Sequence, residues 1–302
     1  MKKIKIAHLY YDLMNLYGEN GNVRFLKKKL EDLGIEVEVH FLSIGDKIDF
    51  DDYEIFYIGS GSEKNFDVVL EDIMKYKDDI KKAIYDNKYF IATGNSLDLF
   101  SKEINYFDGT KKDALSILDC VSYEEEFRIV GEQFYETNVV PDIIVGFQNR
   151  CTLIKEYNNK PLFEVINGTG FNPKDDKEGF LYHNFIGTYL FGPLLVRNPF
   201  FTDWLVKKIC SSYNISYVRP NFDDMPYKAY NEYIKNFYPE KKEQWCSFYL
   251  FKFWISDSDT LITGRIPKWS VKSGSESWIT PIPAELSMLV IPKIYPENSP
   301  FG

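Results

Sequence analysis

Strand-like and helix-like segments alternate through the first hundred residues of this chain, and no other feature constrains its fold as strongly. Short apolar runs typical of strands cover residues 4–10, 35–42, 54–58 and 89–92, and helix-like stretches lie between them at 22–33 and 66–87. Strands joined by such helical crossovers pair in parallel, because each helix returns the chain to the same end of the sheet. We therefore expect an α/β fold with a largely parallel central sheet flanked by helices.

The pattern changes near Ser122 to shorter β-like runs at 128–135, 143–147 and 162–166. A turn is expected at 179–183, leading into a β-like run at 184–190, and a helix is expected at 203–212. Together with the first hundred residues, these segments predict one domain over residues 1–218.

Residues 219–302 are expected to form an aromatic-rich α+β extension of unassigned role. Residues 219–226 are typical of a linker, 227–237 of a helix, and 245–255, 260–266 and 287–294 of strands. Four tryptophans in this region suit either a small packed subdomain or a partner interface: Trp245, Trp254, Trp269 and Trp278. Packing is favoured, because most tryptophans in folded domains are largely buried.

The formal net charge of −9 argues against a nucleic-acid partner, since such proteins carry a basic stripe and none is evident here. No uncharged run approaches membrane-spanning length, and the charged start of the chain lacks a small-residue cleavage site. We expect a cytoplasmic protein without membrane insertion.

Cysteine and histidine spacing does not predict a metal site. The four cysteines are too far apart for a CxxC-type site, and the three histidines form no ligand motif with them: Cys120, Cys151, Cys210 and Cys246; His8, His40 and His183. We therefore expect free thiols, no metal and no cofactor.

Residues 89–100 have the shape of a nucleophile elbow, in which a tight turn between a buried strand and a helix exposes one reactive side chain. The apolar run 89–92 suits the strand, and Leu97, Phe100 and Ile104 recur at helical spacing. Glycine, however, stands at the tip as Gly94. A simpler interpretation is that Gly94 and its neighbours only turn the chain. Residues 59–61 also follow a strand, so both loops are expected at the carboxyl edge of the sheet, where ligands bind in such folds.

Several motifs occur in a recognisable order over residues 1 to about 215. They are Asn15-Leu16-Tyr17 with Gly21-Asn22, then 56–62 (FYIGSGS), 108–110 (DGT), 117–119 (ILD), 145–149 (VGFQN) and 187–193 (GTYLFGP). In order and spacing they resemble the class I glutamine amidotransferases, in the branch similar to cobyric acid synthase. Within that branch they resemble the glutaminase subunits that work with Mur-ligase-like synthetases in amidating the cell-wall precursor lipid II.

The resemblance implies a cysteine nucleophile on the elbow, a histidine that handles its proton, and backbone N–H groups that stabilise the oxyanion. The position matched to the cysteine is Gly94, or Thr93 if the match shifts by one, and the position matched to the histidine is Phe191. Nucleophile and base act as a unit, so the loss of both predicts an inactive protein. We expect a structural or regulatory partner of a Mur-ligase-like or other amide-forming synthetase.

Other parts of the amidotransferase site are matched by residues of this chain. Gly59, Ser60 and Gly61 match the loop whose backbone helps to form the oxyanion hole, and Arg128 falls where the resemblance implies an arginine that helps to hold glutamine. Asn149 matches a cleft residue, whereas the adjoining Gln148 and Arg150 depart from the pattern, and Asn95 and Gln148 complete the expected vestigial pocket. Alternatively, the glycines serve only the turn, and Arg128 is a solvated charge near residues 124–126.

A relocated nucleophile is the alternative hypothesis, which would make this chain an active glutaminase or a hydrolase of another small amide. Ser96, two residues beyond the tip, and Cys151, directly after the cleft motif, are the candidates. No base is evident for either, since His183 lies eight residues before Phe191. A buried and inert Cys151 is favoured, because no neighbour that would lower its pKa is visible.

Overall fold

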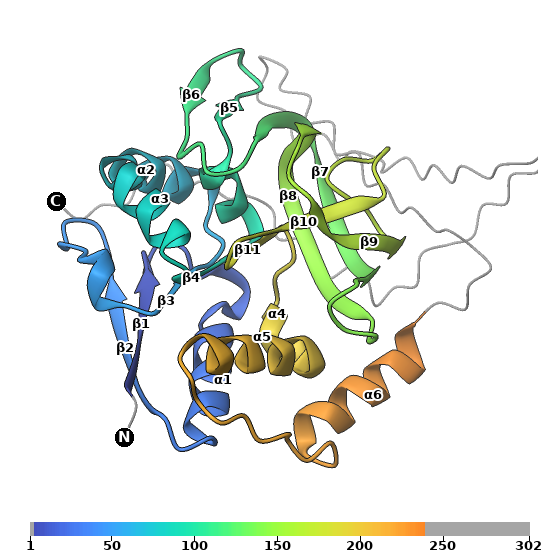
Figure 1. Ribbon diagram of the computed structural model, residues 1–302. Coiled ribbons are helices and arrows are strands. Elements are labelled where there is room, and N and C mark those ends of the chain that lie inside the picture. The colour runs from blue at the N-terminus through green and yellow to red at the C-terminus, as the bar shows by residue number, and fades with distance from the viewer. Residues whose placement is uncertain (1–2, 239–302) are drawn as a thin grey trace, which may run out of the picture.

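The computed structural model describes residues 3–238, which build an eleven-stranded mixed sheet with helices on both faces (Figure 1). The strand order is β2-β1-β3-β4-β11-β10-β9-β7-β5-β6, and β8 pairs with β7. The strands are β1 (Lys3–Leu9), β2 (Glu36–Leu42), β3 (Ile55–Ile58), β4 (Tyr89–Thr93), β5 (Glu103–Asn105), β6 (Lys111–Asp113), β7 (Cys120–Glu136), β8 (Ile144–Tyr157), β9 (Pro161–Asn167), β10 (Lys177–Tyr182) and β11 (Phe185–Thr188).

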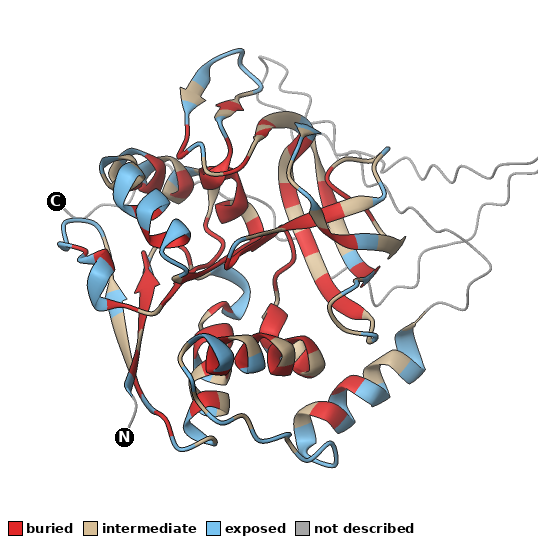
Figure 2. Ribbon diagram, in the orientation of Figure 1, coloured by how far each residue is buried: buried red, intermediate tan, exposed pale blue. Residues whose placement is uncertain are grey.

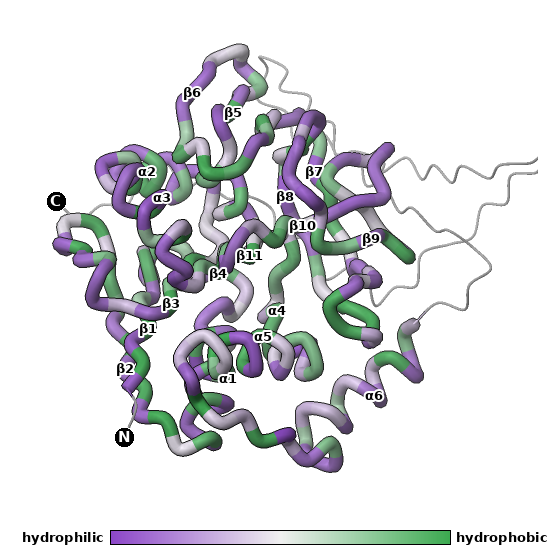
Figure 3. The backbone as a smooth tube through the Cα atoms, viewed as in Figure 1, coloured by the Kyte–Doolittle hydropathy of each residue, from purple (hydrophilic) through white to green (hydrophobic). Residues whose placement is uncertain are grey.

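The described helices are mostly amphipathic, with apolar residues recurring at helical spacing. They are α1 (Asn20–Glu31), α2 (Glu63–Ile73), α3 (Lys77–Tyr85), α4 (Leu194–Arg197), α5 (Pro199–Ser212) and α6 (Met225–Phe237), with short 3-10 turns η1 (Leu16–Gly18), η2 (Phe50–Asp52), η3 (Met74–Tyr76) and η4 (Gly94–Phe100). Within residues 3–238, none of these helices is both long and apolar enough to cross a membrane, and Figure 3 shows polar residues interspersed along α2 and α6.

The parallel half of the sheet consists of β2, β1, β3, β4 and β11. Every residue of β3, β4 and β11 is buried, as the red ribbon at the centre of Figure 2 shows. Helices α2 and α3 pack on one face, and α1, α4 and α5 pack on the other. The predicted α/β architecture is confirmed in this half, and the loops after β3 and β4 lie at one edge, as expected.

The other half is antiparallel except for the parallel pair β5–β7, and it begins at the β10–β11 hairpin, which the sequence interpretation placed wrongly. Residues 179–183 were expected to be a turn, but most of them belong to β10, and the chain reverses at His183, whose φ is +54°. Strands β7 and β8 pair over most of their length and are much longer than the predicted runs. Their charged residues interrupt the apolar pattern, because part of this ribbon faces solvent.

Two helical predictions also need correction. The stretch 66–87 is broken at η3 into two helices, α2 and α3. The helix after the elbow stops at Phe100 and Ile104 lies in β5, because Ser101 is extended and its hydroxyl donates to the carbonyl of Asp98, 2.8 Å away. Ile104 is nevertheless buried in the core that its apolar character predicted.

Helix α6 confirms the helix predicted at 227–237 and packs against the main body. The hydroxyl of Tyr227 donates to Asp203 and accepts from the ammonium of Lys29, and the hydroxyl of Tyr230 donates to the carbonyl of Ile143. The strands predicted after residue 244, the four tryptophans of that region and Cys246 lie outside the described residues.

Candidate functional site

The turn between β4 and η4 has the backbone shape of an elbow. Gly94 has a φ of +66°, in the left-handed region where a side chain is strained and glycine is favoured. Thr93 would be the tip if the match to the family shifted by one residue. It is fully buried, and its hydroxyl donates to Glu19. Gly94 is therefore the residue at the tip.

Ser60 occupies the space above that tip. A Cβ atom added to Gly94 would lie 2.5 Å from both the Cβ and the Oγ of Ser60, closer than Cβ atoms approach other atoms in proteins. Ser60 is only 3% exposed, so it has little room to move away. With Ser60 in this position, residue 94 cannot carry a side chain.

Phe191 fills the second matched position with a buried aromatic ring. Its ring stacks on the ring of Tyr17 with 4.2 Å between centroids, and it packs at a tilt against the ring of Phe147 with 5.8 Å between centroids. Its backbone also exchanges both hydrogen bonds with Phe147. A phenyl ring neither donates nor accepts a proton, so this position provides packing and no base.

Asn95 ties the loop after β3 to the elbow. Its side-chain oxygen accepts from the N–H of Gly61 at 3.0 Å and from the hydroxyl of Ser60 at 3.1 Å, and its amide nitrogen donates to the carbonyl of Gly61. The N–H of Gly61 is thus already used within the protein. A Cβ on Gly61 would collide with the sulfur of Met14, which gives this glycine a packing reason beyond the turn.

Glu19 lies beneath the elbow, and sequence reasoning missed it. Its carboxylate is fully buried and accepts from the hydroxyls of Tyr57 and Thr93 and from the N–H of Gly192, the residue after Phe191. Burial raises its pKa to about 7. In sequence, Glu19 stands in a polar stretch before α1, which gives no signal that separates it from a solvated residue.

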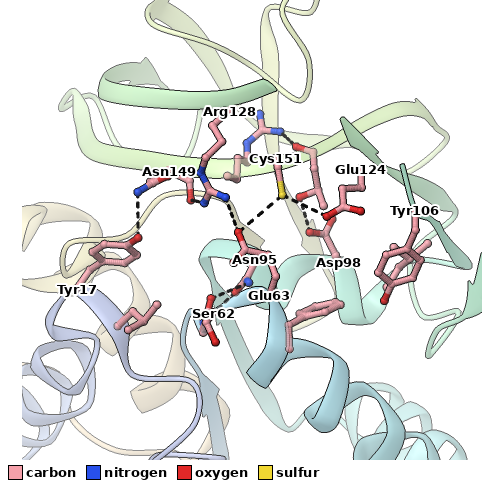
Figure 4. A pocket seen from close by; sticks show the side chains of 16 residues that line it. Tyr17, Ser62, Glu63, Asn95, Asp98, Tyr106, Glu124, Arg128, Asn149 and Cys151 are labelled. Atoms are coloured by element: carbon pink, nitrogen blue, oxygen red, sulfur yellow. Dashed lines mark hydrogen bonds and ion pairs between the residues drawn. The ribbon is translucent and has the colours of Figure 1, made fainter. Parts of the chain in front are cut away.

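A cavity of about 120 Å³ adjoins the elbow between α2, η4 and the β7–β8 ribbon (Figure 4). Its walls combine apolar side chains with charged and amide groups, and they include Leu16, Tyr17, Gly61, Ser62, Glu63, Phe66, Asn95, Asp98, Ile104, Tyr106, Glu124, Arg128, Asn149, Arg150, Cys151 and Thr152. Gly94, Ser60 and Phe191 are not part of this lining. We call this cavity the Arg128 cleft.

Arg128 and Asn149, which the sequence placed in one pocket, are in direct contact. The Nε of Arg128 donates to the side-chain oxygen of Asn149 at 2.9 Å, and its guanidinium forms an ion pair with Glu63. The side-chain amide of Asn149 donates to the hydroxyl of Tyr17. Arg128 therefore lies in the cleft and pairs with Glu63, which no sequence motif had marked, and not with residues 124–126.

Gln148 does not belong to this cleft, which corrects the prediction. Successive residues of a strand point to opposite faces, so Gln148 on β8 faces away from its neighbour Asn149. Its side chain is fully buried, donates to the hydroxyl of Tyr135 and accepts from the Nε of Arg150.

Ser96 has no base beside it, and Cys151 has carboxylates beside it but no imidazole. The hydroxyl of Ser96 is fully buried and donates to the carbonyls of Ile58 and Thr93. Cys151 lines the cleft, but its sulfur lies 3.7 Å from Glu124 and 3.9 Å from Glu63. Burial, together with these carboxylates, raises the pKa of the Cys151 thiol to about 12.

His183 stands at the opposite end of β11 from the elbow. It precedes the first residue of that strand, whereas the cleft adjoins the carboxyl ends of the parallel strands. Its ring packs against Tyr85 and Tyr182. Among residues 3–238, no group of His, Cys, Asp and Glu side chains could hold a metal ion, and the three cysteines described there are free thiols.

Comparison with known proteins identifies the family. The profile of the CobB/CobQ-like glutamine amidotransferase domain matches residues 5–199, more than half of the chain. The chain belongs to this family. It is also 32% identical over 225 residues to GatD of Staphylococcus aureus (strain N315), a match covering 74% of this chain and 91% of that protein.

A second relative of the same kind is GatD of Streptococcus pneumoniae (strain ATCC BAA-255 / R6), 30% identical over 199 residues, which covers 65% of this chain and 76% of that protein. Both relatives are subunits of a glutamine-hydrolysing lipid II isoglutaminyl synthase. A solved glutamine amidotransferase from Thermotoga maritima is similar at a TM-score of 0.44 and 12% identity, over 77% of this chain and 92% of that one.

Proposed function

We propose that this amidotransferase-family protein does not hydrolyse glutamine and serves as a structural or regulatory subunit of an amide-forming synthetase. One observation carries the proposal: Ser60 fills the space that a side chain on the elbow residue Gly94 would need. Acyl transfer from glutamine requires a nucleophile at the tip of the elbow, and this tip holds a glycine under another side chain.

The base is missing as well. A cysteine or serine nucleophile needs a neighbour that takes its proton, and the matched position carries the ring of Phe191, stacked on Tyr17. Residues that act as a unit lose their function together, so no remaining half of the pair would sustain turnover. Packed side chains thus stand at both matched positions: Ser60 over Gly94, and the ring of Phe191 on Tyr17.

A partner role is supported by two related proteins that are themselves synthetase subunits. Two GatD relatives are subunits of a lipid II isoglutaminyl synthase, and this chain spans 91% of one of them. We propose a Mur-ligase-like synthetase as the partner and cell-wall precursor amidation as the setting. Apolar side chains exposed around the Arg128 cleft offer contact surface for it, namely Leu16, Tyr17 and Phe107, at 40%, 45% and 60% exposure.

Ammonia release from glutamine by the purified full-length chain, alone and with candidate synthetases, tests the proposal. We expect no release above the rate without protein, while an active GatD relative assayed in parallel releases ammonia. Sustained turnover by the unmodified chain would refute it. Copurification from the native host tests the partner separately, and recovery of the chain without any synthetase would refute that part.

An active enzyme with a relocated nucleophile is the second candidate, because Cys151 lines the cleft. The carboxylates beside its sulfur disfavour the thiolate, and the buried hydroxyl of Ser96 is committed to backbone carbonyls. If glutaminase turnover is found and disappears in Cys151→Ala or Ser96→Ala, this candidate replaces our proposal.

A further inference from the structure

The Arg128 cleft contains an anion-binding group whose anion is supplied by the chain itself. All three guanidinium nitrogens of Arg128 donate within the protein: one to Glu63, one to the side-chain oxygen of Asn149 and one to the carbonyl of Asn149. Figure 4 shows Glu63 and Arg128 meeting inside the cleft from opposite walls. The planar donors of an arginine match the geometry of a carboxylate or a phosphate.

The guanidinium is held in place independently of Glu63. Asn149 on β8 binds it through two oxygens and is itself anchored by the hydroxyl of Tyr17 at 3.0 Å. Glu63 comes from a different element, the first residue of α2, whose N-cap is the hydroxyl of Ser62. A helix N-terminus favours a negative charge, and at this position Glu63 forms its ion pair with Arg128.

We infer that Glu63 is a resident carboxylate that occupies the anion position of the Arg128 cleft, so that small carboxylate ligands, amino acids above all, bind only when Glu63 is absent or displaced. Phe66 and Ile104 offer an apolar wall for an aliphatic stem. The inference rests on the proposed function, since it explains how a non-hydrolysing member keeps its cleft closed to free amino acids.

Charge in the cleft supports this assignment. Glu124 lies on the far side of Cys151 from Glu63, with the sulfur 3.7 Å from one carboxylate and 3.9 Å from the other. An entering carboxylate would meet the like charges of Glu63 and Glu124 beside the paired guanidinium of Arg128. The second arginine of the cleft, Arg150, is occupied as well, since it donates to Gln148 and to the carbonyls of Thr152 and Gly170, and Asp98 adds a buried carboxyl group. Without Glu63, Arg128 gains a free donor and one of these repulsions disappears. Because the side chains of Glu63 and Arg128 are 40% and 33% exposed, the change should leave the core intact.

Isothermal titration of the full-length chain with L-glutamate and, separately, L-glutamine tests the inference. We expect E63A to lower the Kd for both probes at least about tenfold relative to the unmodified chain, the effect of one added charge-assisted hydrogen bond. E63Q retains the bulk and loses the charge, so its gain should be smaller than that of E63A. Circular dichroism checks that each variant is folded.

Two controls separate the cleft from general charge effects. Glu125 is an acidic neighbour on β7 that pairs with Lys155 and does not line the cleft, so E125A should bind as the unmodified chain does. Adding Arg128→Met to E63A should abolish the gain. Equal affinities of E63A and the unmodified chain, including no heat of binding from either, would overturn the inference. A gain in affinity that survives the loss of Arg128, or a larger gain in E63Q than in E63A, would overturn it too.

Ammonia release measured on the same proteins distinguishes this inference from the proposed function. Binding gained without ammonia supports both. Binding gained together with ammonia supports the role of Glu63 and refutes the loss of hydrolysis. Unchanged binding without ammonia overturns the role of Glu63 and leaves the proposed function standing.

Discussion

Adding one methyl group to Gly94 is predicted to destabilise this protein through two separable effects. The first is the backbone: a φ of +66° costs a residue with a side chain about 1–2 kcal/mol. The second is the contact of the new Cβ with Ser60 at 2.5 Å, and overpacking of this kind costs about 1–3 kcal/mol. Gly94→Ala should therefore lower the free energy of unfolding by about 2–5 kcal/mol.

Ser60→Gly removes only the second effect. By itself it loses the hydrogen bond from the Ser60 hydroxyl to Asn95, worth about 1 kcal/mol, and adds the flexibility of a glycine. In the double variant the new Cβ no longer meets the Ser60 side chain. The two substitutions should thus be coupled by about 1–3 kcal/mol, with the double variant more stable than the sum of the single effects predicts.

Urea unfolding of the four proteins, followed by circular dichroism, measures this coupling. Gly109→Ala is the matched control, because Gly109 also has a positive φ, +87°, but a Cβ there would have no other atom within 4 Å. It should cost only the backbone effect and show no coupling to Ser60→Gly. A coupling between positions 60 and 94 below about 0.5 kcal/mol, the level at which independent sites add, would refute the steric argument.

Three further predictions follow from the site. Glutaminase activity engineered by Gly94→Cys with Phe191→His should require Ser60→Gly as well, and ammonia release by the variant that retains Ser60 would contradict the geometry. Because desolvation and the nearby carboxylates raise the pKa of the Cys151 thiol to about 12, its alkylation by iodoacetamide at about pH 8 should be at least about tenfold slower than that of a free cysteine. Site-resolved mass spectrometry showing equal rates would contradict the raised pKa. Glu178 on β10 is fully buried and accepts from the hydroxyl of Thr188 and the N–H of Tyr189. Burial raises its pKa to about 7, so its protonated form contributes stability that is fully present below the pKa of the unfolded state and is lost as pH rises through about 7. Glu178→Gln should flatten that fall in urea-unfolding free energy, and an unchanged pH profile would show that Glu178 is ionised in the folded state.

The parallel half of the fold was predictable because its signals are local. Each of β1, β3 and β4 is a short apolar run, and the edge at which their loops meet follows from parallel pairing alone. The antiparallel half was harder, since the chain reversal at His183, between β10 and β11, depends on a positive φ, which is uncommon at residues other than glycine. The break between α2 and α3 at η3 also has no evident signal in the sequence, because the apolar spacing around it is helical.

Site residues that belong to a motif could be predicted from the sequence. Those that belong to the site only through a tertiary contact could not. Gly94, Phe191, Arg128 and Asn149 were found through the resemblance to the amidotransferases, and the structure brings the last two together. Glu63 and Glu19 escaped notice, because a carboxylate at a helix start is usually solvated and only the folded chain shows what it binds. The prediction put Gln148 in the cleft because it adjoins Asn149 in sequence, but the side chains of neighbouring residues in a strand point to opposite faces.

By itself, the sequence determined that this chain has an amidotransferase fold in which glycine and phenylalanine stand where a nucleophile and a base are expected. That follows from residue identity, since neither side chain can transfer a proton. Only the tertiary structure decided what packs around these residues: Ser60 fills the space over Gly94, and Glu63 pairs with Arg128. These contacts join residues 34 and 65 positions apart, and such pairings arise from the packing of separate elements, which no local pattern records.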